Sequence, residues 1–249
     1  MTSVIDINVN ETSYESATQQ IHNWAQACES RYVCAANVHM LMEAFDSPEF
    51  AKVVNSADLV TPDGVPLVWM MRAKGQREQS RVYGPTLMLH VLDTACCEDL
   101  SVGFYGSKPD VLNQLVNRML SRYKNLNVAF SYSPSFEPLS PEEDSIMIEK
   151  INGSGARILF VGLGCPKQEI WMSDHRNKVK AVMIGVGAAF DFHAGLKRQA
   201  PAWMQKIGFE WFFRLLMEPR RLWIRYLYHN PRFMLLAIAD LLGLLKKAN

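Results

Sequence analysis

Two long apolar runs, each ending in glycines, constrain this chain more than any other feature. Residues 158–164 read ILFVGLG, and residues 181–187 read AVMIGVG. A run of aliphatic and β-branched residues without polar alternation is typical of a strand that is covered on both faces, as in a parallel sheet. Glycine at the end of such a strand lets backbone approach a ligand closely, at the edge where open α/β sheets bind nucleotides and phosphates. The two runs therefore predict a parallel sheet with a small-molecule site.

The other segments alternate in the way that such a sheet requires. Stretches with helical periodicity separate the strand candidates, and several of them begin with proline, which the first turn of a helix tolerates. We predict an α/β fold with a Rossmann-like, mostly parallel sheet flanked by helices. The expected strands are 3–7, 31–35, 58–60, 100–105, 127–132, 157–161 and 181–186. The expected helices are 14–28, 65–72, 85–97, 109–124, 141–152 and 166–177.

The composition changes after Gly195. Residues 1–195 form the predicted catalytic domain, and residues 196–249 form a predicted helical appendage that mixes arginine with aromatic residues. Ten Lys/Arg against three acids give the appendage a charge of +7, whereas the rest of the chain carries −6. Such a segment is typical of an anionic membrane interface, although a helical subdomain with solvated arginines would look the same. Its expected helices are 201–208, 209–217, 219–229 and 231–245.

Cysteine usage and hydropathy indicate the compartment. The five cysteines are odd in number and lack a paired metal spacing, which fits a reducing cytoplasm better than a disulfide framework. The amino terminus does not resemble a signal peptide, and the longest apolar stretch, Phe233–Leu245, falls well short of the roughly 20 residues that span a bilayer. We expect a cytoplasmic protein that is soluble or peripheral on a membrane, without a nucleic-acid partner.

Asp63 lies in the sequence Thr61-Pro62-Asp63-Gly64, between a short apolar strand and a helix. A carboxylate at the end of a strand can act as a general base. Pro-Asp-Gly is also an ordinary turn sequence, in which Asp63 would cap the helix that begins near Val65. Both interpretations are compatible with this motif.

A second motif, residues 164–169 (GCPKQE), places a predicted helix directly after a glycine turn. Free N–H groups at a helix start favour a phosphate, and Lys167 or Gln168 could add a donor; a plain strand-to-helix connection is the alternative. Asp191 and His193 are interpreted as a polar pair near the site, because one Asp-x-His is weak evidence for a metal. Since the chain has no Asp-x-Asp, the sequence does not support a metal-bridged diphosphate of that common type. We expect no metal site and no cofactor.

Taken in order, several motifs resemble the WecG/TagA/CpsF family, glycosyltransferase family 26. The resemblance spans roughly residues 33–232. The motifs are Ala36-Asn37, residues 58–64 (DLVTPDG), residues 81–84 (RVYG), residues 103–108 (GFYGSK), residues 161–169, residues 185–195, residues 200–203 (APAW), and residues 210–221 (EWFFRLLMEPRR).

The resemblance implies an inverting, metal-independent glycosyltransferase that uses a UDP-sugar and a polyprenyl-diphosphate-linked acceptor at the inner face of the cytoplasmic membrane. Asp63 matches the family's proposed base, and the implied catalytic residues are Asp63, Arg81 and Arg221. The appendage arginines resemble those that close over the site and neutralise the leaving diphosphate. The candidate substrate-binding residues in these motifs are Asn37, Thr61, Gly64, Gly106, Gly164, Lys167, Gln168, Glu169, Gly185, Gly187, Asp191, Arg214 and Arg220.

The first hypothesis is an enzyme that transfers N-acetylmannosamine, its uronic acid or a hexose such as glucose in the synthesis of a cell-surface polysaccharide. A non-catalytic nucleotide-binding scaffold of a polysaccharide assembly complex is the alternative. A nicotinamide-dependent oxidoreductase is a third hypothesis, against which the absence of a GxGxxG fingerprint argues. The sequence leaves open whether the protein forms a homo-oligomer.

Overall fold

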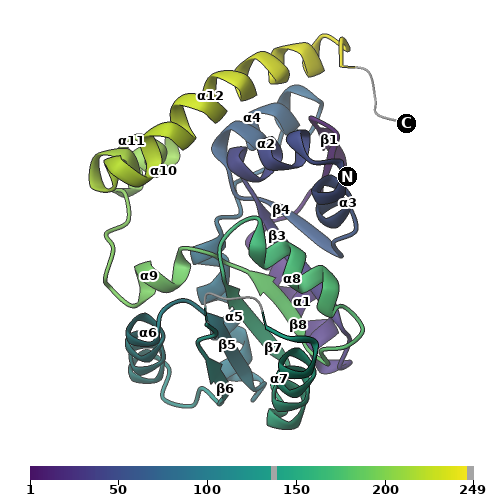
Figure 1. The fold of residues 1–249 in the computed structure, drawn as a ribbon. Coiled ribbons are helices and arrows are strands. Elements are labelled where there is room, and N and C mark those ends of the chain that lie inside the picture. Colours follow the sequence, from purple (N-terminus) through teal and green to yellow (C-terminus); the bar gives the residue numbers. More distant parts are fainter. Residues whose placement is uncertain (136–138, 246–249) are drawn as a thin grey trace. The chain divides into compact units, whose positions relative to one another are not determined.

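The computed structural model describes residues 1–135 and 139–245 and has an α/β fold (Figure 1). Its main sheet has six strands in the order β4-β3-β8-β7-β5-β6, and the pairs of β8 with β3 and β7, and of β5 with β7 and β6, are parallel. The predicted fold class is thus confirmed. These strands are β3 (Arg31–Ala36), β4 (Leu59–Pro62), β5 (Val102–Gly106), β6 (Val128–Tyr132), β7 (Ile158–Gly162) and β8 (Val182–Gly185).

Helices connect the strands, as the alternation of patterns predicted. Lys246 and Lys247, which contribute to the charge of the predicted appendage, lie outside the described residues. The helices are α1 (Tyr14–Gln26), α2 (Val38–Asp46), α3 (Pro48–Asn55), α4 (Val65–Ala73), α5 (Gly84–Cys97), α6 (Pro109–Arg122), α7 (Pro141–Ser154), α8 (Lys167–His175), α9 (Ala189–His193), α10 (Ala202–Lys206), α11 (Glu210–Met217) and α12 (Pro219–Leu241).

The chain divides into two compact units. Unit 1 combines Met1–Ser13, Ala35–Tyr83 and the segment from Arg198 onward, and unit 2 combines Tyr14–Cys34 with Gly84–Lys197. In unit 2, α1 packs against α5, and α9 packs against α5 and α6. In unit 1, α12 packs along α2 and α4 (Figure 1). The predicted domain boundary after residue 195 lies near the end of unit 2, but the C-terminal segment packs within unit 1.

The core of unit 2 explains why the two apolar runs form strands. Residues 158–161 and 182–185 are all buried. Phe104 on β5 stacks on Phe160 on β7 with ring centroids 5.6 Å apart, and Phe190 meets Phe104 edge-on at 5.9 Å. Only a strand that is covered on both faces can bury successive side chains in this way, because neighbouring side chains point to opposite faces.

The first predicted strand, residues 3–7, is wrong. The structure has a separate antiparallel hairpin, in which β1 (Thr2–Val4) pairs with β2 (Ile7–Val9). Ile5 and Asp6 both have positive φ angles, 47° and 60°, so the chain turns back where an uninterrupted strand was expected. In unit 1, Asp240 accepts a hydrogen bond from the Ile5 N–H at 2.9 Å and lies 2.6 Å from Lys74 Nζ, which ties this turn to α12 and α4.

Further differences concern helices, including the short α9, which was not predicted. The prediction placed no helix between residues 36 and 57, whereas the structure has α2 and α3, each capped by a side chain: Asn37 accepts from the Met40 N–H and Ser47 from the Phe50 N–H, both at 3.2 Å. The separate helices predicted at 219–229 and 231–245 are one helix, α12, with Pro231 inside it. Buried Phe233 and other burial along α12 offset the loss of one backbone hydrogen bond at the proline.

Candidate active site

The loop after β4 places Asp63 at the carboxyl end of a buried strand. The Asp63 N–H donates to the carbonyl of Ala36 at 2.9 Å, and the Gly64 N–H donates to the same oxygen at 3.0 Å. Gly64 is the N-cap residue of α4, and within the described chain no side chain caps this helix. The interpretation of Asp63 as the side-chain cap is therefore wrong. The backbone holds this carboxyl group at a strand end, where a general base was predicted.

Arg81 joins Asp63 to a second carboxylate. Arg81 Nη2 lies 3.1 Å from Asp63 Oδ1 and 2.7 Å from Glu210 Oε2, and Arg81 Nε donates to the Asp63 carbonyl. The guanidinium carbon lies 4.1 Å from the centroid of the Tyr83 ring, whose hydroxyl donates to Glu210 Oε1 at 2.9 Å. All three ionic side chains are less than one fifth exposed. Because they are shielded from solvent, their charges interact more strongly than surface charges do.

The pKa values in this cluster follow from burial and charge. Burial opposes the charged form of Arg81, but the carboxylates of Asp63 and Glu210 outweigh it, and the pKa of Arg81 is raised above its usual value. Burial, with Glu210 and Asp63 adding to it, raises the pKa of Tyr83 well above its usual value. Arg81 therefore stays a cation and Tyr83 a hydroxyl donor at any physiological pH.

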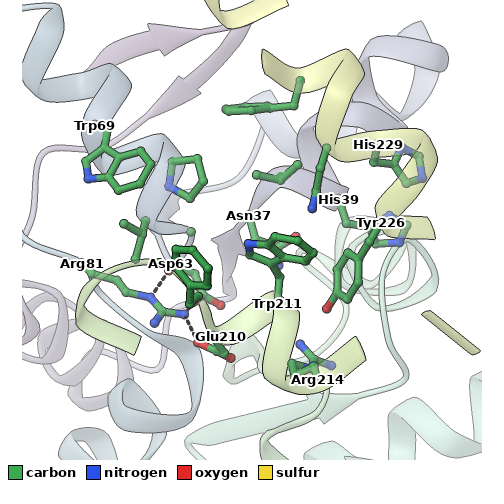
Figure 2. A pocket seen from close by; sticks show the side chains of 18 of the residues that line it. Asn37, His39, Asp63, Trp69, Arg81, Glu210, Trp211, Arg214, Tyr226 and His229 are labelled. Atoms are coloured by element: carbon green, nitrogen blue, oxygen red, sulfur yellow. Dashed lines mark hydrogen bonds and ion pairs between the residues drawn. The ribbon is translucent and has the colours of Figure 1, made fainter. Parts of the chain in front are cut away.

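These residues line a pocket of about 400 Å³ within unit 1. Figure 2 shows Asp63, Arg81 and Glu210 close together, with the dashed hydrogen bonds and ion pairs between them. Arg214 from α11 and Arg225 from α12 add two further cations to the lining. The aromatic residues of the wall are Trp69, Tyr83, Phe209, Trp211, Tyr226 and Phe233. A pocket that joins an apolar aromatic wall to a few convergent charged groups suits a ligand with both sugar and anionic parts.

In unit 2, Gln168 binds both glycine turns. Its Oε1 accepts from the Gly164 N–H at 3.2 Å and from the Gly187 N–H at 3.1 Å. Both glycines have positive φ angles, 81° and 51°, which glycine adopts without strain. A Cβ atom added to Gly185 would lie 3.0 Å from Gln168 Nε2 and 2.8 Å from the end of Met172. The glycines therefore let the turns approach one glutamine closely.

Glu169 lies beside Gln168 and is fully buried. Its Oε1 accepts from Gln168 Nε2 at 2.7 Å, and Cys165 adds a weaker hydrogen bond to the carboxyl group. Burial raises the pKa of this carboxyl group from 4.5 to about 7, against the opposing effect of the Gln168 hydrogen bond. In this structure Glu169 orients Gln168 and does not face solvent.

Of the remaining candidate residues in unit 1, some line the pocket and others do not. Asn37 lines the unit 1 pocket and also caps α2. Thr61 is fully buried on β4, and its Oγ1 has no hydrogen-bond partner in the described parts of the chain. Arg220 and Arg221 lie exposed in the first turn of α12 and do not line the pocket; Arg221 Nη1 lies 2.7 Å from Glu218 Oε1.

Other candidates lie in unit 2. Lys167 is exposed at the start of α8, and Gly106 ends β5. The predicted polar pair of Asp191 and His193 has different partners: Lys197 Nζ lies 3.2 Å from Asp191 Oδ2, and His193 Nε2 lies 2.8 Å from the carbonyl of Pro85.

The prediction did not include Glu210 and Tyr83 as site residues. Both lie in the quoted motifs, residues 210–221 and 81–84, and that was the available signal. Their role depends on hydrogen bonds between residues more than 120 positions apart in the chain.

In the described residues, the group of side chains with the right spacing for a metal ion is His39, Glu43 and His229, and none of these was predicted as a ligand. No helix of the described chain has the length and hydropathy to cross a bilayer.

Comparison with known proteins supports the resemblance. Residues 2–247 match the model of the glycosyl transferase WecG/TagA/CpsF family. The chain is 30% identical, over 209 residues, to the N-acetylglucosaminyldiphosphoundecaprenol N-acetyl-beta-D-mannosaminyltransferase of Bacillus subtilis (strain 168), and the match covers 84% of this chain and 79% of that protein. With a parallel α/β sheet, a carboxylate at a strand end and a match over nearly its whole length, the chain belongs to the WecG/TagA/CpsF family and is a glycosyltransferase.

Proposed function

We propose that this protein transfers N-acetylmannosamine, or a related sugar, from a UDP-sugar onto a polyprenyl-diphosphate-linked saccharide during the synthesis of a cell-surface polysaccharide. The observation that carries the proposal is the carboxylate of Asp63, held by Arg81 in the wall of an aromatic pocket. The name of the Bacillus subtilis relative, a mannosaminyltransferase acting on a diphosphoundecaprenol-linked sugar, supports the choice of sugar and acceptor.

The proposed reaction is a single displacement with inversion. Asp63 takes the proton of an acceptor hydroxyl while that oxygen attacks the anomeric carbon of the donor, and the bond from this carbon to the UDP oxygen breaks on the opposite face. The electron pair leaves with UDP, whose diphosphate gains negative charge. Arg214 and Arg225 line the same pocket, and we propose that such arginines stabilise this charge in place of a metal.

Arg81 contributes by orientation. It contacts both the side chain and the carbonyl of Asp63, so it limits the rotation of the carboxyl group. The second ion pair of Arg81, with Glu210 on α11, makes the C-terminal segment part of this arrangement.

We also propose that the enzyme binds to the inner face of an anionic membrane. The solvent-exposed side of α12 supports this proposal. Leu222, Phe233 and Ala237 are buried on one side of the helix. Apolar side chains on its other side recur at helical spacing and are each more than half exposed: Ile224, Leu227, Leu235 and Ile238. Arg220 and Arg221 lie exposed at the start of the same helix. An apolar helix face flanked by arginines binds anionic lipid surfaces.

The experiment that tests the reaction is acceptor-dependent UDP release by wild type and Asp63→Asn, with a polyprenyl-diphosphate-GlcNAc acceptor and a panel of UDP-sugars. We expect the rate to fall by about 10²- to 10⁴-fold, while UDP binding stays unchanged. Asp174→Asn, which changes an exposed aspartate on α8, is the control and should retain full activity. Wild-type protein that binds UDP but releases none from any donor would contradict the proposal and support the scaffold hypothesis.

The membrane part has a separate test, sedimentation with anionic vesicles. Ile224→Asp/Leu227→Asp should lose vesicle binding, whereas Ile146→Asp, an exposed apolar position on α7, should keep it. Deleting the C-terminal segment would be a poorer test, because it removes buried Leu222 and Phe233 from unit 1. Unchanged vesicle binding by the double variant would contradict the membrane assignment, and a change of its oligomeric state would identify this face as an interface between copies.

A further inference from the structure

Two histidines and a glutamate converge in unit 1. His39 and Glu43 are four residues apart on α2, so their side chains lie on the same face of the helix, and His229 belongs to α12, which packs on α2. Glu43 Oε1 lies 3.5 Å from His39 Nδ1 and 3.7 Å from His229 Nε2. All three potential ligand atoms lie within 4.8 Å of one another. Figure 2 shows His39 and His229 in the pocket wall, on the side away from Arg81.

The distances within this cluster resemble a metal site more than a hydrogen-bonded network. Hydrogen bonds from imidazole to carboxylate lie at about 2.7–3.2 Å, so separations of 3.5 and 3.7 Å are too long. Neighbouring ligand atoms of a tetrahedral zinc ion are about 3.4 Å apart when each bond is about 2.1 Å long. Two of the three pairs thus lie close to the spacing that a shared ion requires, and the third lies within 4.8 Å.

Shielding suits a bound cation, and the charges near the cluster are mixed. Two cations on α12, Arg225 and Arg232, act on His229. The side chains of His39 and His229 are 14% and 12% exposed, and that of Glu43 is 34% exposed, so an ion would be shielded but could enter from the pocket. Glu43 supplies a negative charge. Arg232, which lies nearby on α12, is paired with Asp46 at 2.5 and 2.8 Å, so a carboxylate of its own offsets its charge.

We propose that His39, Glu43 and His229 bind a divalent ion of the zinc class that fastens α12 to α2. Two imidazole nitrogens and one carboxylate oxygen are a donor set that zinc takes, with water or a pocket ligand in the fourth position. The ion has a structural role: because residue 229 is 190 positions from residue 39, one shared ion links two distant parts of unit 1. The proposed ligands are not the residues used in the proposed sugar transfer, Asp63 and the arginines, but both sets line the same pocket.

The test is titration of the full, tag-free chain, first dialysed against a chelator, with Co²⁺ and then Zn²⁺. We expect one Co²⁺ per chain with the visible absorption of a tetrahedral site, displacement by one Zn²⁺, and a higher Tm with zinc. Glu43→Gln and His229→Gln should each weaken binding by more than about 100-fold, since even partners outside the ligand shell are worth 10- to 100-fold. His90→Gln, in unit 2 on α5, is the matched control and should titrate as wild type.

The result that would overturn the proposal is a wild type that binds no Co²⁺ stoichiometrically, or binding that survives both Glu43→Gln and His229→Gln. Circular dichroism without metal shows whether each variant is folded. If His229→Gln is unfolded, Glu43→Gln and His39→Gln decide the question. Asp63→Asn should bind metal as wild type does, so that failure of this proposal and failure of the sugar-transfer proposal give different results.

Discussion

Glu169 is expected to make the folded protein less stable as pH rises from about 4.5 to about 7. Its carboxyl group is fully buried, and burial raises its pKa in the folded state to about 7 from 4.5. Between these two values the folded state binds more protons than the unfolded state, so the free energy of unfolding falls with increasing pH. The Glu169 contribution is fully present below pH 4.5 and is lost as pH rises through 7.

The magnitude follows from the size of the shift. At 1.36 kcal/mol per pKa unit, the full difference is about 3 kcal/mol, of which about 2–3 kcal/mol falls between pH 5 and pH 8. Glu169→Gln keeps an oxygen that can accept from Gln168 but cannot ionise. We therefore expect its free energy of unfolding, relative to wild type, to rise by about 2–3 kcal/mol between pH 5 and pH 8.

Urea unfolding at both pH values measures this double difference, because every other titrating group is common to the two proteins. Glu149→Gln, which changes an exposed glutamate on α7, is the control and should follow wild type at both pH values. If the free energies of unfolding of wild type and Glu169→Gln changed by the same amount from pH 5 to pH 8, the reasoning from burial would be refuted.

Three further predictions concern the two hydrogen-bond clusters. Arg81→Lys should lower UDP release about 10- to 100-fold, because lysine cannot bridge two carboxylates, and activity equal to that of the exposed-site control Arg77→Lys would contradict the bridging role. Tyr83→Phe should lower the free energy of unfolding by about 1.5–3 kcal/mol, since it removes a buried donor to a carboxylate; a change below about 0.5 kcal/mol would count against that bond. Gln168→Leu should cost about 2–6 kcal/mol by leaving the N–H groups of two glycine turns without their acceptor, and an unchanged urea midpoint would argue that water replaces the amide.

Strand prediction succeeded where burial on both faces imposed a pattern on consecutive residues. The predicted strands 157–161 and 181–186 match β7 and β8 within two residues at each end. Asp63 and Arg81 were named from motifs, and both line the pocket of unit 1. The glycine turns were recognised because a residue without a side chain at a strand end has a local physical meaning.

Helix prediction failed for α2 and α3 although local signals were present. Asn37 and Ser47 are ordinary N-cap residues, Pro48 lies in the first turn of α3, and the buried residues Phe50 and Val54 are four positions apart on one helix face. For α12, tertiary packing decided the outcome. Pro231 by itself predicts the end of a helix, but α12 continues through this residue because Phe233 and Ala237 are buried on one of its faces. Packing energy of this kind exceeds local propensity and is invisible before the fold is known.

The sequence by itself determined the parallel α/β architecture, the family and the residues that motifs name, because each depends on patterns of neighbouring residues. The tertiary structure decided which of those residues meet. It joined Arg81 to Glu210 across 129 positions, brought His229 to Glu43, and buried Glu169 where its motif suggested a ligand contact. Hydrogen bonds, ion pairs and burial depend on distances in space, and distances between remote residues arise only when the chain has folded.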